Sequence, residues 1–195
     1  MAGVMGTLRT EPALSRPDLL APAVIEALQA WTGAGDGSAV DGSAVGGGEV
    51  LVAPIDPALA DTAAFCARYE VGLDVSANCV VVAGRREGET RYAACVVLAT
   101  TRADVNNVVR RQLDVRKASF VPTDLAVAET GMEYGGITPI GLPKGWPILV
   151  DARVVATPYV IIGSGVRHSK IALPGPALAR LPGAEVIEGL AKPVS

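Results

Sequence analysis

The residues best suited to chemistry form a glycine-rich loop, Thr130-Gly-Met-Glu-Tyr-Gly-Gly-Ile-Thr-Pro-Ile-Gly141. Glycine permits positive φ and the close approach of a ligand, and proline fixes the loop backbone. Such a loop can aim successive amide N–H groups at an oxyanion, a carboxylate or a phosphate. The alternative interpretation is a tight double turn that joins sheet elements. The loop matches neither GxxxxGK[ST] nor GxGxxG, which argues against a nucleotide hydrolase or a dinucleotide-binding protein.

The cysteines and the histidine argue against a metal centre or a disulfide scaffold. Cys66, Cys79 and Cys95 include no CxxC pair and have apolar neighbours, so we expect them to be reduced core residues. Strand alternation predicts that Cys79 faces away from Asn78, into the core. His168 has no partners at ligand spacing. We therefore expect neither a metal nor another cofactor.

Several segments together resemble the YbaK and prolyl-tRNA-synthetase-associated (ProX-like) family of aminoacyl-tRNA editing domains. The most specific is Gly135-x-x-x-Pro139, which is similar to the family's GxxxP element. Gly163-Ser-Gly-Val-Arg167 is similar to its Ser/Gly-rich turn. The resemblance runs from about residue 49 to residue 187. It implies metal-independent hydrolysis of the ester that joins a wrong, small amino acid to the 3′-terminal ribose of a tRNA.

The same resemblance implies a set of site residues. Catalysis would involve Asn78, at the position of the family's characteristic lysine, and the loop residues Gly135, Gly136, Ile137, Thr138 and Pro139. The substrate-binding candidates are Thr130, Gly131, Tyr134, Lys144, Asp151, Gly163, Ser164 and Gly165. Lys144 and His168 are the candidates to bring a charge or a proton to the pocket, and Asp151 to orient Lys144 or a loop amide. Tyr134 and Trp146 are candidates to stack a terminal base, or else ordinary packing aromatics.

Asn78 is the main departure from the family pattern. Asparagine offers only neutral hydrogen bonds where lysine would carry a charge. Two functions therefore stay open, a trans-acting aminoacyl-tRNA deacylase and a module that binds an aminoacyl end or a related small molecule without hydrolysing it. A regulatory or scaffold domain is a third interpretation, but a scaffold has no need of the glycine loop.

Charge is distributed unevenly. The net charge is −3, yet residues 85–170 contain 12 Lys and Arg against 8 Asp and Glu. This basic middle is compatible with contacts to a few phosphates of a tRNA acceptor stem, and equally with chance clustering. The candidate tRNA-binding residues are Arg85, Arg86, Arg110, Arg111, Arg116, Lys117 and Arg167. The tRNA acceptor end is the expected partner, with an aminoacyl-tRNA synthetase as a further one.

Composition and periodicity predict an α+β fold with a curved, mixed and mostly antiparallel sheet flanked by helices. Half of the 195 residues are apolar but only 4% are aromatic, so Val, Leu, Ile and Ala must build the core. No strict βαβ alternation is present. The predicted helices cover 17–31, 57–69, 104–113, 122–129 and 176–181, and the predicted strands cover 49–53, 78–83, 91–100, 148–151, 159–163, 170–173 and 185–187.

The predicted domain organisation has three parts. Residues 1–32 form an accessory helical segment, residues 33–48 a Gly/Ser-rich flexible linker, and residues 49–190 the editing-like domain. We expect this domain to fold without residues 1–48. No apolar run is long enough to span a bilayer, and the N-terminal residues lack a secretory pattern, so a cytoplasmic location is expected.

Overall fold

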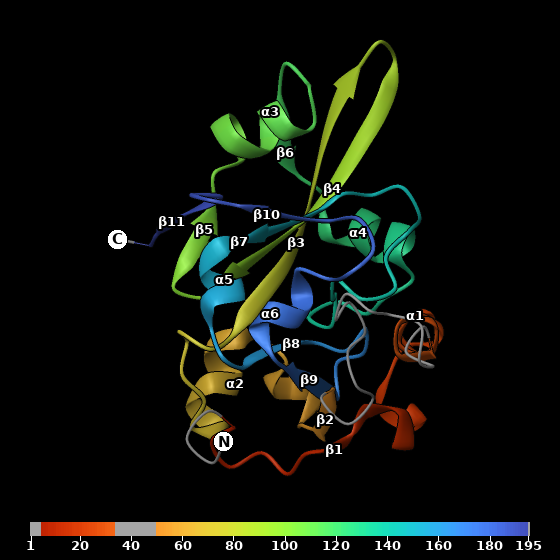
Figure 1. Ribbon diagram of the computed structural model, residues 1–195, viewed down its shortest axis with the longest axis vertical. Coiled ribbons are helices and arrows are strands. Elements are labelled where there is room, and N and C mark those ends of the chain that lie inside the picture. Colours follow the sequence, from red (N-terminus) through yellow and green to blue (C-terminus); the bar gives the residue numbers. More distant parts are fainter. Residues whose placement is uncertain (1–4, 34–49, 195) are drawn as a thin grey trace.

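The fold is built on two sheets in opposite halves of the molecule, joined by the long strand β3 (Figure 1). The computed structural model describes residues 5–33 and 50–194. Where the sheets meet, Ser76 forms a bridge to Ile161 of the smaller sheet. This junction positions the candidate site.

The larger sheet is mixed. Its strand order is β10 (Ala184–Ile187), β7 (Ile148–Asp151), β4 (Glu89–Leu98), β3 (Ala77–Arg86) and β6 (Ala118–Phe120). The predicted hairpin is confirmed, because β3 and β4 pair antiparallel over their whole length. In contrast, β7 runs parallel to both β4 and β10. Successive apolar residues of β7 enter different cores, since Ile148 and Val150 pack on one face and Leu149 on the other.

The smaller sheet is wholly antiparallel. Its order is β1 (Glu11–Pro12), β2 (Leu51–Pro54), β9 (Ser169–Leu173) and β8 (Val160–Gly163). Every residue of β8 and β9 is buried, including Lys170. A separate ribbon pairs β5 (Thr101–Ala103) with β11 (Ala191–Pro193).

Helices pack around the two sheets (Figure 1). The α-helices of the described residues are α1 (Pro22–Gly33), α2 (Thr62–Tyr69), α3 (Arg110–Gln112), α4 (Thr123–Thr130), α5 (Ala152–Ala156) and α6 (Gly175–Leu178). Tighter turns are η1 (Ala13–Ser15), η2 (Pro17–Leu19) and η3 (Pro57–Leu59), and η4 (Val105–Val109) is a π-helical turn. The α+β class with a mostly antiparallel mixed sheet is thus confirmed. The strands β1, β5, β6 and β11, of two or three residues, were not expected.

The helix predicted over residues 57–69 is two elements. Asp56 accepts a hydrogen bond from Ala58 N (2.9 Å) and caps η3, and Asp61 accepts one from Ala63 N (3.1 Å) and caps α2. Ala63, in the first turn of α2, is exposed. Phe65 and Cys66 are the buried residues of α2.

The N-terminal segment packs against the rest of the chain. On α1, Val24, Leu28 and Trp31 recur at helical spacing and are buried in the same core cluster as Ile162 of β8. In addition, β1 pairs with β2. This packing argues against independent folding of residues 49–190. Apart from Gly33, the predicted linker over 33–48 lies outside the described residues.

Candidate functional site

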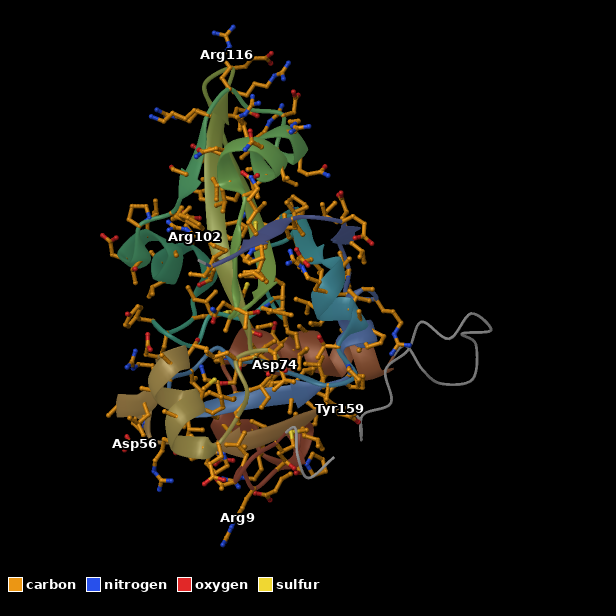
Figure 2. The ribbon with its side chains drawn as sticks, turned by 90° about the vertical axis from the view of Figure 1, so that its left-hand side faces the viewer. Arg9, Asp56, Asp74, Arg102, Arg116 and Tyr159 are labelled. Carbon is orange, nitrogen blue, oxygen red and sulfur yellow. The ribbon has the colours of Figure 1, made fainter. Side chains whose placement is uncertain are left out.

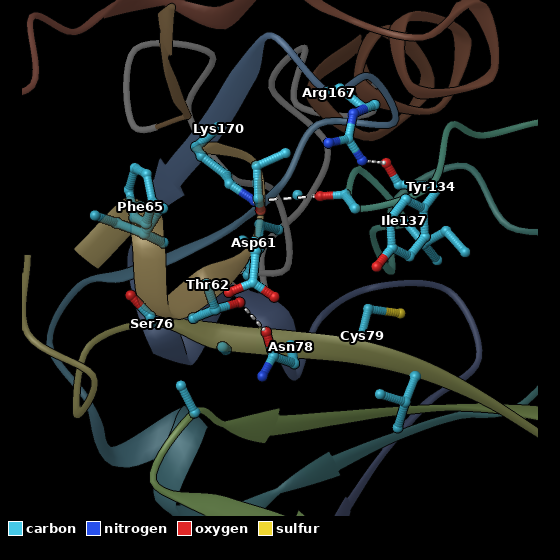
Figure 3. A pocket seen from close by; sticks show the side chains of 18 of the residues that line it. Asp61, Thr62, Phe65, Ser76, Asn78, Cys79, Tyr134, Ile137, Arg167 and Lys170 are labelled. Carbon is cyan, nitrogen blue, oxygen red and sulfur yellow. Dashed lines mark hydrogen bonds between the residues drawn. The ribbon is translucent and has the colours of Figure 1, made fainter. Parts of the chain in front are cut away.

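A cavity of about 660 Å³ lies at the junction of the two sheets. Its walls come from β3, the start of α2, the loop after α4, and strands β8 and β9. A volume of this size, with a mixed apolar and polar lining, is typical of small-molecule sites. In Figure 3, Asp61, Thr62 and Asn78 stand on one side, with Tyr134, Ile137 and Arg167 across from them.

The glycine loop is held in place by close backbone contact with the turn after β8. Gly165 N donates to Gly136 O at 2.7 Å. A Cβ on Gly136 would lie 2.6 Å from Val166 O, and a Cβ on Gly163 would lie 2.4 Å from Gly136 O. A side chain at Gly136 would therefore meet protein backbone. These glycines permit the close packing of two loops, which brings Gly135 and Ile137 to the cavity wall.

Arg167 ties the loop to the residues that precede α2. Its guanidinium donates to Tyr134 O (2.8 Å) and to Pro57 O (3.0 Å), and it lies 5.1 Å from the centroid of the Tyr134 ring. Its backbone N–H donates to the Glu133 carboxylate at 2.6 Å. The arginine predicted to contact tRNA thus lines the cavity and fixes the shape of its mouth.

Asn78 lies in the cavity wall on β3, as expected from its position. Its Oδ1 accepts a hydrogen bond from Thr62 Oγ1 at 2.7 Å (Figure 3). Cys79 was predicted to face the core, but it is half-buried and lines the cavity together with its neighbours on β3. Burial raises the pKa of the Cys79 thiol far above its usual range. The thiol is therefore protonated at neutral pH and is a poor nucleophile.

Two ionisable residues of the cavity wall were not predicted from the sequence, Asp61 at the start of α2 and Lys170 on β9. The Lys170 side chain is buried, and Nζ donates to Ala60 O (3.1 Å) and Gly135 O (3.3 Å). Burial, and to a smaller extent the nearby Arg167 cation, lower the pKa of Lys170 from 10.5 to about 8. The available signal was a single lysine inside the otherwise apolar strand Ser169–Leu173.

Several predicted site residues lie outside the cavity and have structural contacts instead. Thr130 Oγ1 donates to Ala126 O (2.7 Å), and Gly131 ends α4 with a positive φ. Thr138 and Pro139 are buried behind the loop. Ser164 Oγ lies 2.7 Å from Ser169 Oγ, and Gly165 packs on Ala21.

The two charged substrate-binding candidates also lie elsewhere. Lys144 is exposed and does not line the cavity. Asp151 is buried, and its carboxylate pairs with Arg153 (2.9 Å) and accepts from Ala191 N (2.9 Å). Although burial opposes ionisation, these hydrogen bonds keep the pKa of Asp151 below its usual value. Asp151 therefore holds α5 and β11 in place. The role expected from the sequence was to orient Lys144 or a loop amide.

A groove of about 520 Å³ beside the hairpin collects part of the predicted basic set. Arg85, Arg116 and Lys117 line it together with Tyr92 and the exposed Phe120. Phe120 and Val121 line both the groove and the cavity, so the two are adjacent. Figure 2 shows Arg116 at one end of the molecule, with its side chain directed outward.

The remaining basic candidates are outside this groove. Arg86 pairs with Asp114 and Glu87. The Nε atoms of Arg110 and Arg111 donate to carbonyl oxygens one turn earlier. Trp146, expected to stack a base, is stacked on Tyr92 with ring centroids 4.6 Å apart. His168 contacts Asp18 O in the N-terminal segment.

No three His, Cys, Asp or Glu side chains of residues 5–33 and 50–194 gather in a way that could hold a metal ion. None of the helices in this part of the chain combines the length and the hydropathy that crossing a bilayer requires.

Comparisons with known proteins connect this geometry to one family and one fold. The family described as "aminoacyl-tRNA editing domain" matches residues 56–181. A candidate trans-editing enzyme for prolyl-tRNA synthetase is 17% identical, with a TM-score of 0.65 over 87% of this chain and 97% of that one. A designed epitope scaffold is 19% identical (TM-score 0.65, covering 90% and 100%). A hypothetical protein is 18% identical (TM-score 0.64, covering 72% and 90%). At these identities the structural matches show the shared fold.

Proposed function

The chain belongs to the aminoacyl-tRNA editing domain family, and from this premise we propose that it is a trans-acting deacylase of mischarged tRNA. This membership confirms the resemblance seen in the sequence. The observation that carries the proposal is the loop Tyr134–Ile137, which lines a cavity opposite Asn78 and is held there by glycine backbone contacts. A rigid loop beside a reacting ester can position it for attack by water.

We propose that the reaction needs no metal and that the amino acid is small. The first point is what the resemblance to the family implies. In support of the second, the cavity has to hold the terminal ribose as well as the amino acid. Its apolar wall of Phe65, Ile137 and Ile161 limits the room left for a side chain. Alanine, serine and cysteine are the expected substrates.

The acceptor end of the tRNA would approach along the groove of Arg85, Arg116 and Lys117. These cations offer contacts to phosphates, and the exposed ring of Phe120 offers a surface for stacking at the point where groove and cavity meet. The substrate would then reach the cavity with its 3′ end first. A tRNA substrate also fits a cytoplasmic location and a partnership with an aminoacyl-tRNA synthetase, both of which stay proposals.

Removal of a groove cation should weaken tRNA binding without changing the cavity. For Arg116→Ala we expect a several-fold higher Kd at low salt and a slope of log K against log salt that falls by about 1. Arg9→Ala is the matched control, because Arg9 is exposed at the opposite end of the molecule (Figure 2). Equal effects of the two substitutions on Kd and slope, measured by titration with uncharged tRNA, would contradict the groove assignment.

The deacylase proposal is tested with a panel of tRNAs that each carry a wrong small amino acid. We expect wild-type protein to release one of them faster than the spontaneous rate. Because Asn78 lines the cavity, Asn78→Ala should reduce kcat/KM, and Asn78→Lys reports whether a charge at this position helps. A wild-type rate equal to the spontaneous rate on every member of the panel would contradict the proposal.

One observation favours a second candidate, a binding module without hydrolytic activity. Asn78 is neutral and is already hydrogen-bonded to Thr62, so it supplies no charge to the ester. In this case an amide-linked, non-hydrolysable aminoacyl-adenosine would bind the wild type, while no ester in the panel would be hydrolysed. Hydrolysis gained in Asn78→Lys would support the hypothesis of a binding module that lacks the lysine of the family.

A further inference from the structure

Lys170 places a buried amino group in the wall of the cavity. The residue is 8% exposed, and its Nζ lies 5.5 Å from the centroid of the Phe65 ring. Lysine is almost never buried to this extent without an ion-pair partner, because the loss of hydration disfavours its charge. We therefore expect the cost of burying the Lys170 charge on β9 to be offset by a function of that charge.

The hydrogen bonds of Lys170 leave one donor for a ligand. An ammonium group has three N–H donors, and two of them are directed to Ala60 O and Gly135 O, at 3.1 and 3.3 Å. Both acceptors are neutral carbonyl oxygens, and among the described residues no carboxylate forms an ion pair with Nζ. In Figure 3 the Nζ atom lies between the start of α2 and the glycine loop. The third donor is thus available at the cavity wall.

The charged and titratable groups nearest Lys170 are Asp61, Cys66 and Arg167. The pKa of Lys170 is lowered to about 8, mainly by burial and also by Arg167, while Cys66 and Asp61 act in the opposite direction. The group is consequently an ammonium at pH 7 and becomes largely neutral above pH 9. Its charge is therefore lost at a pH where an arginine in the same place would keep it.

We propose that the Lys170 ammonium donates its third hydrogen to the carbonyl oxygen of the bound aminoacyl ester and stabilises the oxyanion formed there. This inference rests on the proposed deacylase function. Water forms a bond to the carbonyl carbon, and the carbonyl π pair moves to the oxygen that Lys170 contacts. Collapse of this intermediate breaks the bond to the ribose oxygen, which takes a proton from the attacking water. The products are the free amino acid and the 3′-hydroxyl of the tRNA.

A purely structural role of Lys170 predicts a different pH dependence. A neutral amine still has two N–H donors, which is enough to hold Ala60 O and Gly135 O. Loss of the proton would then leave the loop in place and the rate unchanged. Oxyanion stabilisation requires the charge, so the rate must fall as the amine loses its proton.

The test compares kcat/KM of the full-length wild type, Lys170→Met and Lys170→Arg between pH 6 and 10. The substrate is one mischarged tRNA that the wild type hydrolyses, and the spontaneous rate is subtracted. We expect a descending limb near pH 8 for the wild type, a loss of about 100-fold in Lys170→Met, and partial activity without that limb in Lys170→Arg. Because all three share one substrate, titration of the substrate itself appears in every profile.

The outcomes separate this inference from the proposed function. Wild-type turnover with no descending limb overturns the role of Lys170 and leaves the deacylase intact, even if Lys170→Met fails to fold. The role is also overturned if folded Lys170→Met keeps the wild-type rate. No turnover by the wild type on any mischarged tRNA overturns the proposed function, and the role of Lys170 with it.

Discussion

Gly136→Ala is expected to lower kcat/KM for deacylation by about 100-fold, because one added methyl group separates the two loops that shape the cavity. The new Cβ would lie 2.6 Å from Val166 O, 2.7 Å from Val166 C and 2.8 Å from Val166 N. These are backbone atoms, so the clash cannot be relieved by a side-chain rotation. Overpacking of this kind costs about 1–3 kcal/mol, which thermal unfolding should detect.

Gly145→Ala is the control for this substitution. Gly145 lies in the same connection between α4 and β7, but nothing lies within 4 Å of its Cβ position. Its φ of +87° makes alanine unfavourable by about 1 kcal/mol, without disturbing the cavity. We expect a small loss of stability and an unchanged kcat/KM. If Gly136→Ala and Gly145→Ala had the same kinetics, the contact between the loops would not matter for activity.

Leu28→Ala should destabilise the protein by about 3 kcal/mol, although it lies in the segment expected from sequence to be accessory. Leu28 of α1 is 0% exposed and shares a core cluster with Val52 and Ile162 of the smaller sheet. For a chain of this length the loss corresponds to a fall in Tm of about 6–12 °C. By the same reasoning, deletion of residues 1–48 should abolish the cooperative unfolding transition.

Gln29→Ala provides the comparison, because this neighbouring residue of α1 is exposed. We expect it to change the stability by less than about 0.5 kcal/mol. A Leu28→Ala variant as stable as Gln29→Ala, or a cooperative transition in the 49–195 fragment, would restore the interpretation of an accessory segment.

Local patterns predicted those parts of the fold that local forces determine. The hairpin of β3 and β4 follows from alternation and a polar turn, and α4 ends at Gly131 because glycine adopts the positive φ of +66° found there. The glycine loop was singled out from its composition, but its Gly136 serves a contact between two backbones. That contact depends on Val166, which lies far along the chain, and no local pattern reports it.

Two kinds of prediction error have the same physical cause: residues assigned to the pocket that lie outside it, and cavity residues that were not assigned to it. Asp151 was interpreted as a pocket residue, but it caps α5 and receives the amide of Ala191 from a strand that was not expected. Lys170 was interpreted only as part of a strand. Its place in the cavity depends on the pairing of β9 with β8 and on the approach of Ala60 and Gly135 from two other elements. Pairing between distant segments thus determines which charged residues reach the cavity.

The most direct test that the cavity is the site of hydrolysis is single-turnover deacylation of a mischarged tRNA. It compares the wild type, Ala63→Trp and Ala67→Trp. Both alanines are exposed on α2, but only Ala63 lines the cavity, so an indole there blocks the cavity and leaves the core untouched. We predict hydrolysis by the wild type and by Ala67→Trp, and a rate near the spontaneous one for Ala63→Trp. Equal hydrolysis by all three proteins would show that the ester is cleaved elsewhere, and would contradict the assignment of the cavity as the active site.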